Sequence, residues 1–203
     1  KLPALAISAL QKALAIQPND LDTLFQLADL YYSQGDLGQA EETFRKIVRS
    51  SPGDSNTETA LINLGIILDD MERYAEAIST FEQAISINPK NENAYYNLGI
   101  AYKNSGQPTK AIENWQKATA LNPASIKNRE AIADYYAENG FLIEAARESD
   151  DIARVNKDEN KIKIKLADVY YKLKNFESAE KHLTEVLNGS KNGPEIKLAH
   201  RKL

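Results

Sequence analysis

The feature that most constrains the fold is a pattern of apolar and small residues that returns every 34 residues. Within a copy, apolar residues three and four positions apart predict an amphipathic helix, a polar break follows, and a second such stretch ends near a proline. One copy carries Leu61, Leu64, Gly65, Leu68, Ala77, Phe81, Ala84 and Pro89, and the next carries Tyr95, Leu98, Gly99, Tyr102, Ala111, Trp115, Ala118 and Pro123. This period predicts stacked helix pairs, because a single pair cannot bury its apolar face alone.

Residues 92–125 resemble one repeat of the tetratricopeptide repeat family, whose pattern they match at every one of these positions. The resemblance implies an all-α fold, a right-handed superhelical solenoid of antiparallel helix pairs, in which the first helix of each pair lines a concave surface. Below, the first helix is helix A, the second is helix B, and position 1 is the residue aligned with Glu92. We expect Gly99 and Ala111 where the two helix backbones approach.

The register predicts a single domain over residues 1–203 with about five full repeats, at 21–54, 58–91, 92–125, 126–159 and 160–193. Residues 1–20 fit helix B only, and residues 194–203 look like a truncated further helix A, so both ends read as half-repeats. The step from Ala28 to Gly65 is 37 residues. We expect the three extra residues in the loop between the first two full repeats, since insertions usually lengthen loops.

Composition excludes several classes of protein. No cysteine is present, so thiolate metal sites and cysteine nucleophiles are excluded, although this does not decide the compartment. No apolar run approaches the roughly 18 residues of a membrane span. Residues 160–203 hold 10 Lys or Arg against 5 Asp or Glu, but without a nucleic-acid-binding module we interpret them as a solvated basic face.

No catalytic or metal motif is found. The sequence has no glycine-rich phosphate loop, no paired-histidine metal motif and no nucleophile elbow. Its two histidines, His182 and His200, are far apart, and we expect His182 on an exposed helix surface. We therefore predict a protein that is not an enzyme and has no cofactor and no bound metal.

The positions that the repeat pattern leaves free on helix A are 2, 5, 6, 9, 12 and 13. In the central repeats they carry apolar and aromatic residues, which is the composition of a binding patch, although packing between neighbouring A helices explains them about as well. In several tetratricopeptide proteins an asparagine at position 6 bonds the backbone of an extended peptide, which implies this role for Asn63 and Asn97. The candidate groove residues are Asn63, Ile66, Asn93, Tyr96, Asn97, Ile100 and Lys103.

The pattern favours a protein–protein interaction scaffold that binds an extended peptide or a partner helix. One alternative is the partner- or substrate-recruiting arm of a larger enzyme, such as a glycosyltransferase. Another is a structural scaffold that self-associates through open end helices. The family's clamp for carboxylate-terminated chaperone tails is not expected, since only two of its five positions match around Asn97 and none around Asn63 supplies a cation.

Overall fold

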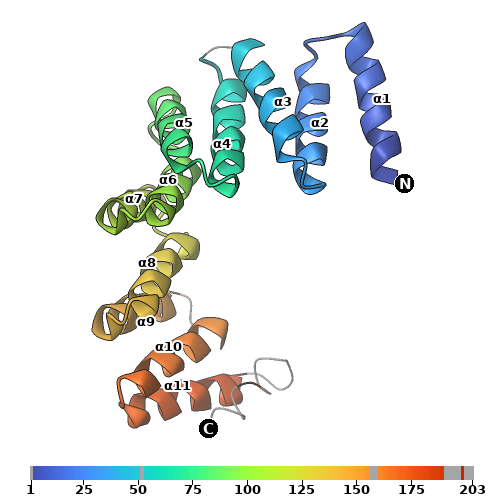
Figure 1. Ribbon diagram of the computed structural model, residues 1–203. Coiled ribbons are helices and arrows are strands. Elements are labelled where there is room, and N and C mark those ends of the chain that lie inside the picture. The colour runs from blue at the N-terminus through green and yellow to red at the C-terminus, as the bar shows by residue number, and fades with distance from the viewer. Residues whose placement is uncertain (1, 51–52, 156–159, 190–197, 199–203) are drawn as a thin grey trace. The chain divides into compact units, whose positions relative to one another are not determined.

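The computed structural model describes residues 2–50, 53–155, 160–189 and 198. Over these residues it consists of eleven α-helices and contains no strand (Figure 1), which confirms the predicted all-α class. The helices are α1 (Leu2–Ile16), α2 (Leu21–Ser33), α3 (Leu37–Ser50), α4 (Ser55–Asp70), α5 (Tyr74–Ile87), α6 (Glu92–Asn104), α7 (Pro108–Leu121), α8 (Ile126–Glu138), α9 (Leu142–Val155), α10 (Asn160–Lys172) and α11 (Phe176–Gly189).

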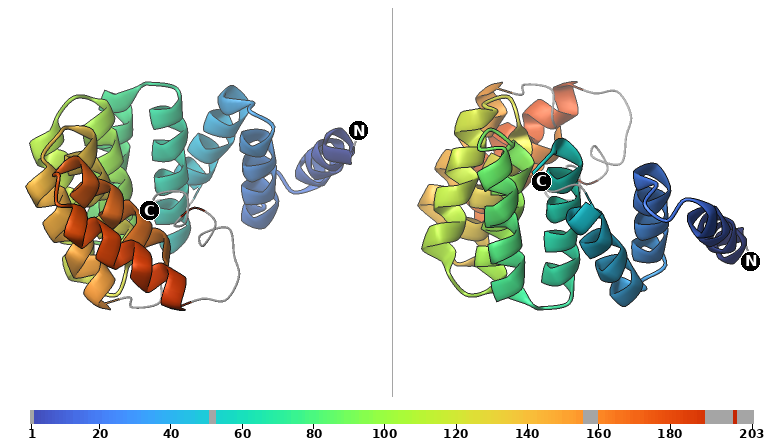
Figure 2. Two further views of the ribbon diagram at one scale, coloured as in Figure 1. Left: turned by 90° about the horizontal axis from the view of Figure 1, so that it is seen from below. Right: turned by 90° about the horizontal axis from the view of Figure 1, so that it is seen from above.

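The helices form two compact units, Lys1–Leu121 and Asn122–Leu203, here called unit 1 and unit 2. In unit 1 the A–B pairs are α2 with α3, α4 with α5 and α6 with α7, and the B helices α3 and α5 also pack on the next A helices, α4 and α6 (Figure 2). In unit 2 the pairs are α8 with α9 and α10 with α11. A single domain over 1–203 stays a prediction. The predicted helix at 194–203 lies outside the described residues, apart from Leu198.

Local sequence signals define where the A helices begin. Asp20, Asp54 and Asn91 precede α2, α4 and α6, and their side chains accept hydrogen bonds from backbone N–H groups of the first turn. Such caps satisfy donors that have no partner inside the helix. In unit 1, polar capping residues therefore help to set the start of the A helices α2, α4 and α6, together with the apolar pattern.

The predicted loop insertion is wrong, because the extra residues are helical. Helix α4 begins at Ser55 and has 16 residues, whereas α2 and α6 have 13 each. Asp54 caps the backbone N–H of Thr57 at 2.8 Å, which starts the helix three residues before the repeat register does. The insertion therefore lengthens helix A by almost one turn.

The buried core includes the repeat positions that the sequence pattern predicted and two further positions that the pattern did not predict. Predicted core residues such as Leu64, Leu98 and Trp115 are buried. Positions 3 and 10 of helix A are also buried, because they pack on helix B of the preceding repeat. Ala94 at position 3 of α6 belongs to one cluster with Ala84 of α5. Val169 at position 10 of α10 belongs to another with Ala145 of α9. Buried residues at positions 3 and 10 include Ala60, Ile67, Ala94, Ala101, Ile162 and Val169.

Candidate functional site

The candidate site lies on the A helices of unit 1, and we call it the A face: positions 2, 5, 6, 9, 12 and 13 of α2, α4 and α6. These spacings place the residues on one side of each helix. Helix α4 contacts α6 directly, so their A-face residues belong to neighbouring surfaces. Asn93 is exposed, and the other predicted groove residues are half-buried, namely Asn63, Ile66, Tyr96, Asn97, Ile100 and Lys103.

Aromatic side chains support the A face from behind. A Cβ atom added to Gly99 would lie 2.4 Å from Nε1 of Trp115, and one added to Gly65 would lie 2.5 Å from the Phe81 ring. The indole N–H of Trp115 also donates to the backbone oxygen of Tyr96 at 3.1 Å. Glycine at position 8 is therefore needed to admit a ring from helix B, rather than to let two backbones touch.

Two equivalent hydrogen bonds join neighbouring A helices across the face. The hydroxyl of Tyr32 at position 12 donates to Oδ2 of Asp70 at position 13 of the next repeat, at 2.7 Å. One repeat further, Nδ2 of Asn104 at position 13 donates to Oδ2 of Asp69 at position 12, also at 2.7 Å. These bonds link the C-terminal ends of α2, α4 and α6, so this edge of the face is held in register.

The two position-6 asparagines are placed alike on α4 and α6. Asn97 donates from Nδ2 to the backbone oxygen of Asn93 at 2.9 Å, within its own helix. This bond orients the amide and leaves its oxygen as the atom that could accept from a ligand N–H. Nearby apolar residues are partly covered: Ile62 packs against the cluster of Leu61, and Phe25 meets the Phe44 ring edge-on at 6.0 Å.

Two carboxylates on the A face, Asp29 and Asp69, have raised pKa values. Partial desolvation raises the pKa of Asp29. The pKa of Asp69 is raised mainly by burial, against a lowering by the Asn104 hydrogen bond, and further by the neighbouring Asp70 charge. The hydrogen bond to Asp70 raises the pKa of Tyr32. At the C-terminal edge of the face, burial therefore disfavours the charged form of Asp69, and its hydrogen bond with Asn104 offsets only part of this effect.

Not every free position of helix A is open. Ile164, at position 5 of the last full repeat in unit 2, is buried in a cluster with Ala167 and Leu183. On the same unit, Lys165 pairs with Asp134 at 2.9 Å and Glu130 at 3.4 Å. On the A helices of unit 2, the charge of Lys165 is therefore compensated within the fold.

The prediction that His182 is exposed is wrong. Its ring stacks on Tyr170 with centroids 5.6 Å apart and planes 6° apart, and its side chain is 14% exposed. Tyr170 donates to Oδ2 of Asp150. Burial lowers the pKa of His182, while burial and the Asp150 bond raise the pKa of Tyr170 to about 12. The repeat register could not predict the burial of His182, because its stacking on Tyr170 depends on how α10 and α11 pack together.

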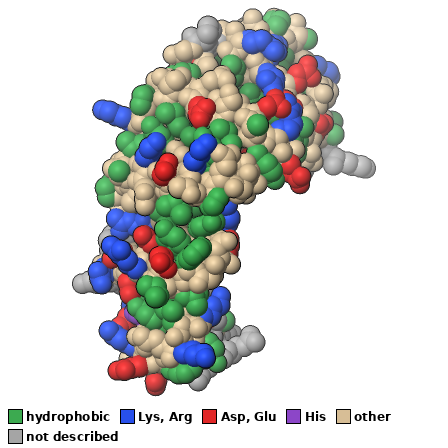
Figure 3. All heavy atoms as spheres, turned by 60° about the vertical axis from the view of Figure 1, so that its left-hand side comes forward, with side chains coloured by type: hydrophobic (Ala, Val, Ile, Leu, Met, Phe, Trp, Pro, Cys, Tyr) green, Lys and Arg blue, Asp and Glu red, His purple; other side chains and the backbone are tan. Residues whose placement is uncertain are grey.

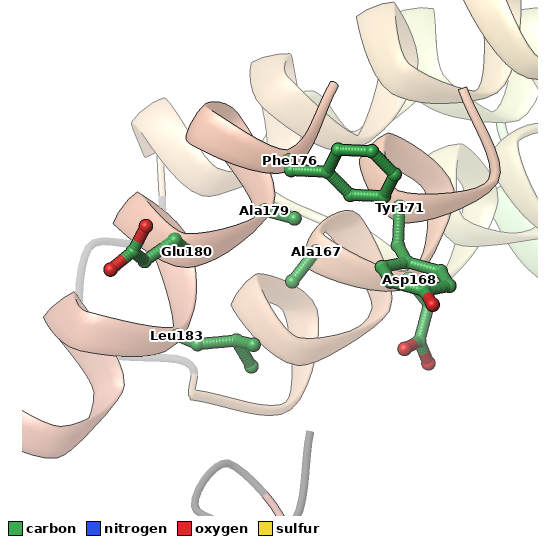
Figure 4. Close-up of a pocket in the computed structure, with 7 residues that line it drawn as sticks. All are labelled: Ala167, Asp168, Tyr171, Phe176, Ala179, Glu180 and Leu183. Atoms are coloured by element: carbon green, nitrogen blue, oxygen red, sulfur yellow. The ribbon is translucent and has the colours of Figure 1, made fainter. Parts of the chain in front are cut away.

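Unit 2 also carries a pocket of about 430 Å³ between α10 and α11 (Figure 4), lined by Ala167, Asp168, Tyr171, Phe176, Ala179, Glu180 and Leu183. The rings of Tyr171 and Phe176 meet at 5.4 Å at one end of it. Phe176 is 58% exposed, whereas its counterparts in the preceding repeats are half-buried: Leu37, Tyr74, Pro108 and Leu142.

In the part of the chain that the structure describes, neither a metal-binding group nor a membrane-spanning helix is found. Among the described residues, no group of three or more His, Asp or Glu side chains could hold a metal ion. Within the same residues, no helix has the length and apolar character needed to cross a bilayer.

Comparison with known families gives matches along the chain. Models described as tetratricopeptide repeat match residues 2–61, 92–125 and 161–188, and a model described as TPR repeat matches residues 65–106. A comparison with curated proteins finds no match.

Solved structures of the same fold are numerous. A crystal structure of MamA is 28% identical over 76% of this chain and 89% of its own, with a TM-score of 0.66. YrrB, described as a TPR protein with an unusual peptide-binding site, is 22% identical over 95% of this chain and 98% of its own, with a TM-score of 0.62. PilW, described as a type IV pilus biogenesis factor, is 18% identical over 98% of this chain and 90% of its own, with a TM-score of 0.76.

Proposed function

Because the chain belongs to the tetratricopeptide repeat family, we propose that it is a protein-interaction scaffold whose A face binds an extended peptide segment of another protein. The observation that carries the proposal is the recurrence of Asn63 and Asn97, half-buried at equivalent positions on the neighbouring helices α4 and α6. An amide side chain both donates and accepts, so it suits the alternating N–H and C=O groups of an extended backbone.

The surroundings of the two asparagines support this function. Ile66, Tyr96 and Ile100 are half-buried, so each presents part of its apolar surface on the same face. A partner that covers this surface gains hydrophobic free energy, while the amides fix the register of its backbone. YrrB, which shares the fold, is described as having a peptide-binding site, and this agrees in kind with the proposal.

The test uses a peptide selected from a displayed random-sequence library against the purified chain. We expect Asn63→Ala with Asn97→Ala to weaken its binding about tenfold or more, since each lost hydrogen bond costs about 0.5–1.5 kcal/mol. Fluorescence anisotropy gives the dissociation constants, and circular dichroism checks that helicity and melting are unchanged.

The matched control is Asn139→Ala. Nδ2 of Asn139 donates to the backbone oxygen of Tyr135 at 2.8 Å, the same bond to a residue four positions earlier that Asn97 makes, but in unit 2. The control should bind like the parent chain. An unchanged dissociation constant in the Asn63 and Asn97 variant would remove the asparagines from the proposal.

In the alternative function, the chain is the recruiting arm of a larger enzyme. The A face would then bind the protein that is the enzyme's substrate or partner. The described residues contain only repeats of one packing unit, which supports a non-enzymatic role for this segment. Both alternatives use the A face, so the binding experiment applies to each.

A further inference from the structure

The A helices of unit 1 differ in charge from the B helices beside them. Helices α2, α4 and α6 carry six acidic residues and one basic residue, Lys103, whereas α3, α5 and α7 carry five of each sign. On the face shown in Figure 3, toward which the side of α5 and α7 is turned, basic and acidic side chains are intermingled. The imbalance therefore belongs to the A helices.

Four of these acidic residues lie on the A face. Asp22, Asp29 and Asp70 are exposed, and Asp69 is half-buried. Asp69 and Asp70 end α4, and neither α2 nor α4 has a basic residue in its last turn. Carboxylates at a helix C-terminus oppose the helix dipole, which favours cations there. The fold therefore keeps negative charge at a position that is unfavourable for stability.

Among the described residues, no cation acts on Asp29 or Asp69, although cations are paired with carboxylates elsewhere in unit 1. The pKa of Asp29 is raised by desolvation, and that of Asp69 mainly by desolvation and then by Asp70, with no lowering by a cation in either case. By contrast, Glu41 pairs with both Arg45 and Arg73, at 2.9 and 2.7 Å, on the side of the B helices. A partner's cation would meet the A-face charge without displacing an internal ion pair.

Apolar and acidic side chains alternate along the same face. Asp29 lies one turn before Tyr32, whose hydroxyl contacts Asp70, and Asp70 lies one turn after Ile66. In an extended segment, residues two positions apart point in the same direction, so a basic residue two positions from an aliphatic one can present both groups to this face. The ligand that complements this face has both aliphatic and basic residues.

We propose that the A face binds an extended segment of another protein that carries Lys or Arg residues among aliphatic ones, with the cations against Asp29 and Asp70 and the aliphatic side chains against Ile62, Ile66 and Ile100. The inference rests on the proposed peptide-binding function and specifies the chemistry of the partner. Charge complementarity supplies selectivity and rate, and apolar burial supplies affinity.

The experiment uses three fluorescein-labelled synthetic peptides with the same aliphatic residues and with Lys, Gln or Glu at the same positions, two residues away from the aliphatic ones. We expect the Lys peptide to bind about tenfold tighter than the Glu peptide, with the Gln peptide between them. The preference should shrink as salt rises, because the Debye length falls from about 10 Å at 0.1 M to about 3 Å at 1 M.

Two variants with the same change in net charge locate the effect. Asp29→Asn with Asp70→Asn should lose the preference for the Lys peptide, and Asn can still accept the Tyr32 hydroxyl. Glu42→Gln with Glu113→Gln, at exposed positions on α3 and α7, should keep it. Equal loss in both pairs would mean that overall charge decides the preference, which overturns the inference.

The outcomes separate this inference from the proposed function. If the Gln or Glu peptide binds as tightly as the Lys peptide, and Asn63→Ala with Asn97→Ala weakens that binding, the peptide-binding function stands and the basic partner is wrong. If none of the three binds but a peptide selected from the random-sequence library does, the basic partner is wrong and the peptide-binding function stands; if the library yields no binding peptide either, both are overturned.

Discussion

At the scale of single residues, small side chains decide how closely an A helix approaches its B helix. The Trp115 indole occupies the space above Gly99, and the Phe81 ring does the same at Gly65. Both rings are almost fully buried. Because protein interiors are close-packed, an added methyl group at either glycine must displace a ring that has no free volume beside it.

We expect Gly99→Ala to destabilise unit 1 by about 1–3 kcal/mol, the usual cost of overpacking a core. The matched control is Gly38→Ala in α3, where an added Cβ would find its nearest heavy atom at 4.0 Å. The control should be neutral or stabilising by about 0.5–1 kcal/mol, since alanine is the better helix former. Urea denaturation measures both, and equal effects in the two variants would contradict the packing argument.

A second residue-scale prediction concerns His182. Its pKa is lowered in the folded chain from an ordinary value of 6.5, chiefly by burial and also by Lys181 and Lys163, while Glu185 and Asp150 act in the opposite direction. The unfolded chain then binds a proton more readily than the folded one, so stability present above pH 6.5 is lost as pH falls below it.

Thermal melting of the parent chain and of His182→Gln, followed at neutral pH and at about pH 5, tests this, since an unperturbed histidine titrates near 6.5. The parent should lose more stability than the variant on acidification. The same loss in both would show that other groups cause the acid sensitivity.

At the scale of elements, the turn between helix A and helix B has one backbone conformation in every full repeat. Position 15 has positive φ throughout, with glycine in three repeats and Glu72 and Lys174, both at φ 60°, in the other two. A left-handed conformation is unfavourable for a residue with a Cβ. The turn at Glu72 is therefore stabilised by the packing of α4 on α5, against the local preference.

We expect Glu72→Gly to stabilise unit 1 by about 1 kcal/mol, because glycine adopts this conformation without the steric cost. Glu42→Gly, the same substitution inside α3, should destabilise by about 0.5–1 kcal/mol or more. Chemical denaturation of both variants measures the change in the free energy of unfolding, which should be opposite in sign for the two. A destabilising Glu72→Gly would mean that the glutamate side chain contributes more than the backbone costs.

At the scale of the whole molecule, apolar side chains remain uncovered on α1. Leu5 is 68% exposed and Ile16 is 82% exposed, although α1 packs on α2. Exposed large apolar side chains favour association, because a partner that covers them removes apolar surface from water. Self-association through α1 was predicted from the sequence and stays a prediction.

Light scattering over a range of protein concentrations tests whether the chain self-associates through α1. We expect the parent chain to form oligomers as its concentration rises, and Leu5→Ser with Ile16→Ser to remain monomeric, since the exposed apolar surface is removed without loss of buried contacts. A parent chain that stays monomeric at high concentration would end the proposal of a self-assembling scaffold.

The sequence by itself determined the fold class and the identity of each helix. The period, the caps and the alternation of small and aromatic residues are local signals, and each repeat packs mainly on its neighbours, so local information was enough. The residues proposed for the A face were also named from the register, because free positions follow from the buried ones. The charge imbalance of α2, α4 and α6 was readable as well, once the helices were assigned.

The tertiary structure alone decided what depends on contacts between helices. It showed that the three inserted residues extend α4, that positions 3 and 10 are buried on the preceding repeat, and that Ile164 is covered. It also placed Tyr32 beside Asp70, Asn104 beside Asp69, and His182 on Tyr170. Burial and pKa depend on atoms brought together from separate helices, and a repeat pattern specifies stacking without specifying which polar side chains then meet.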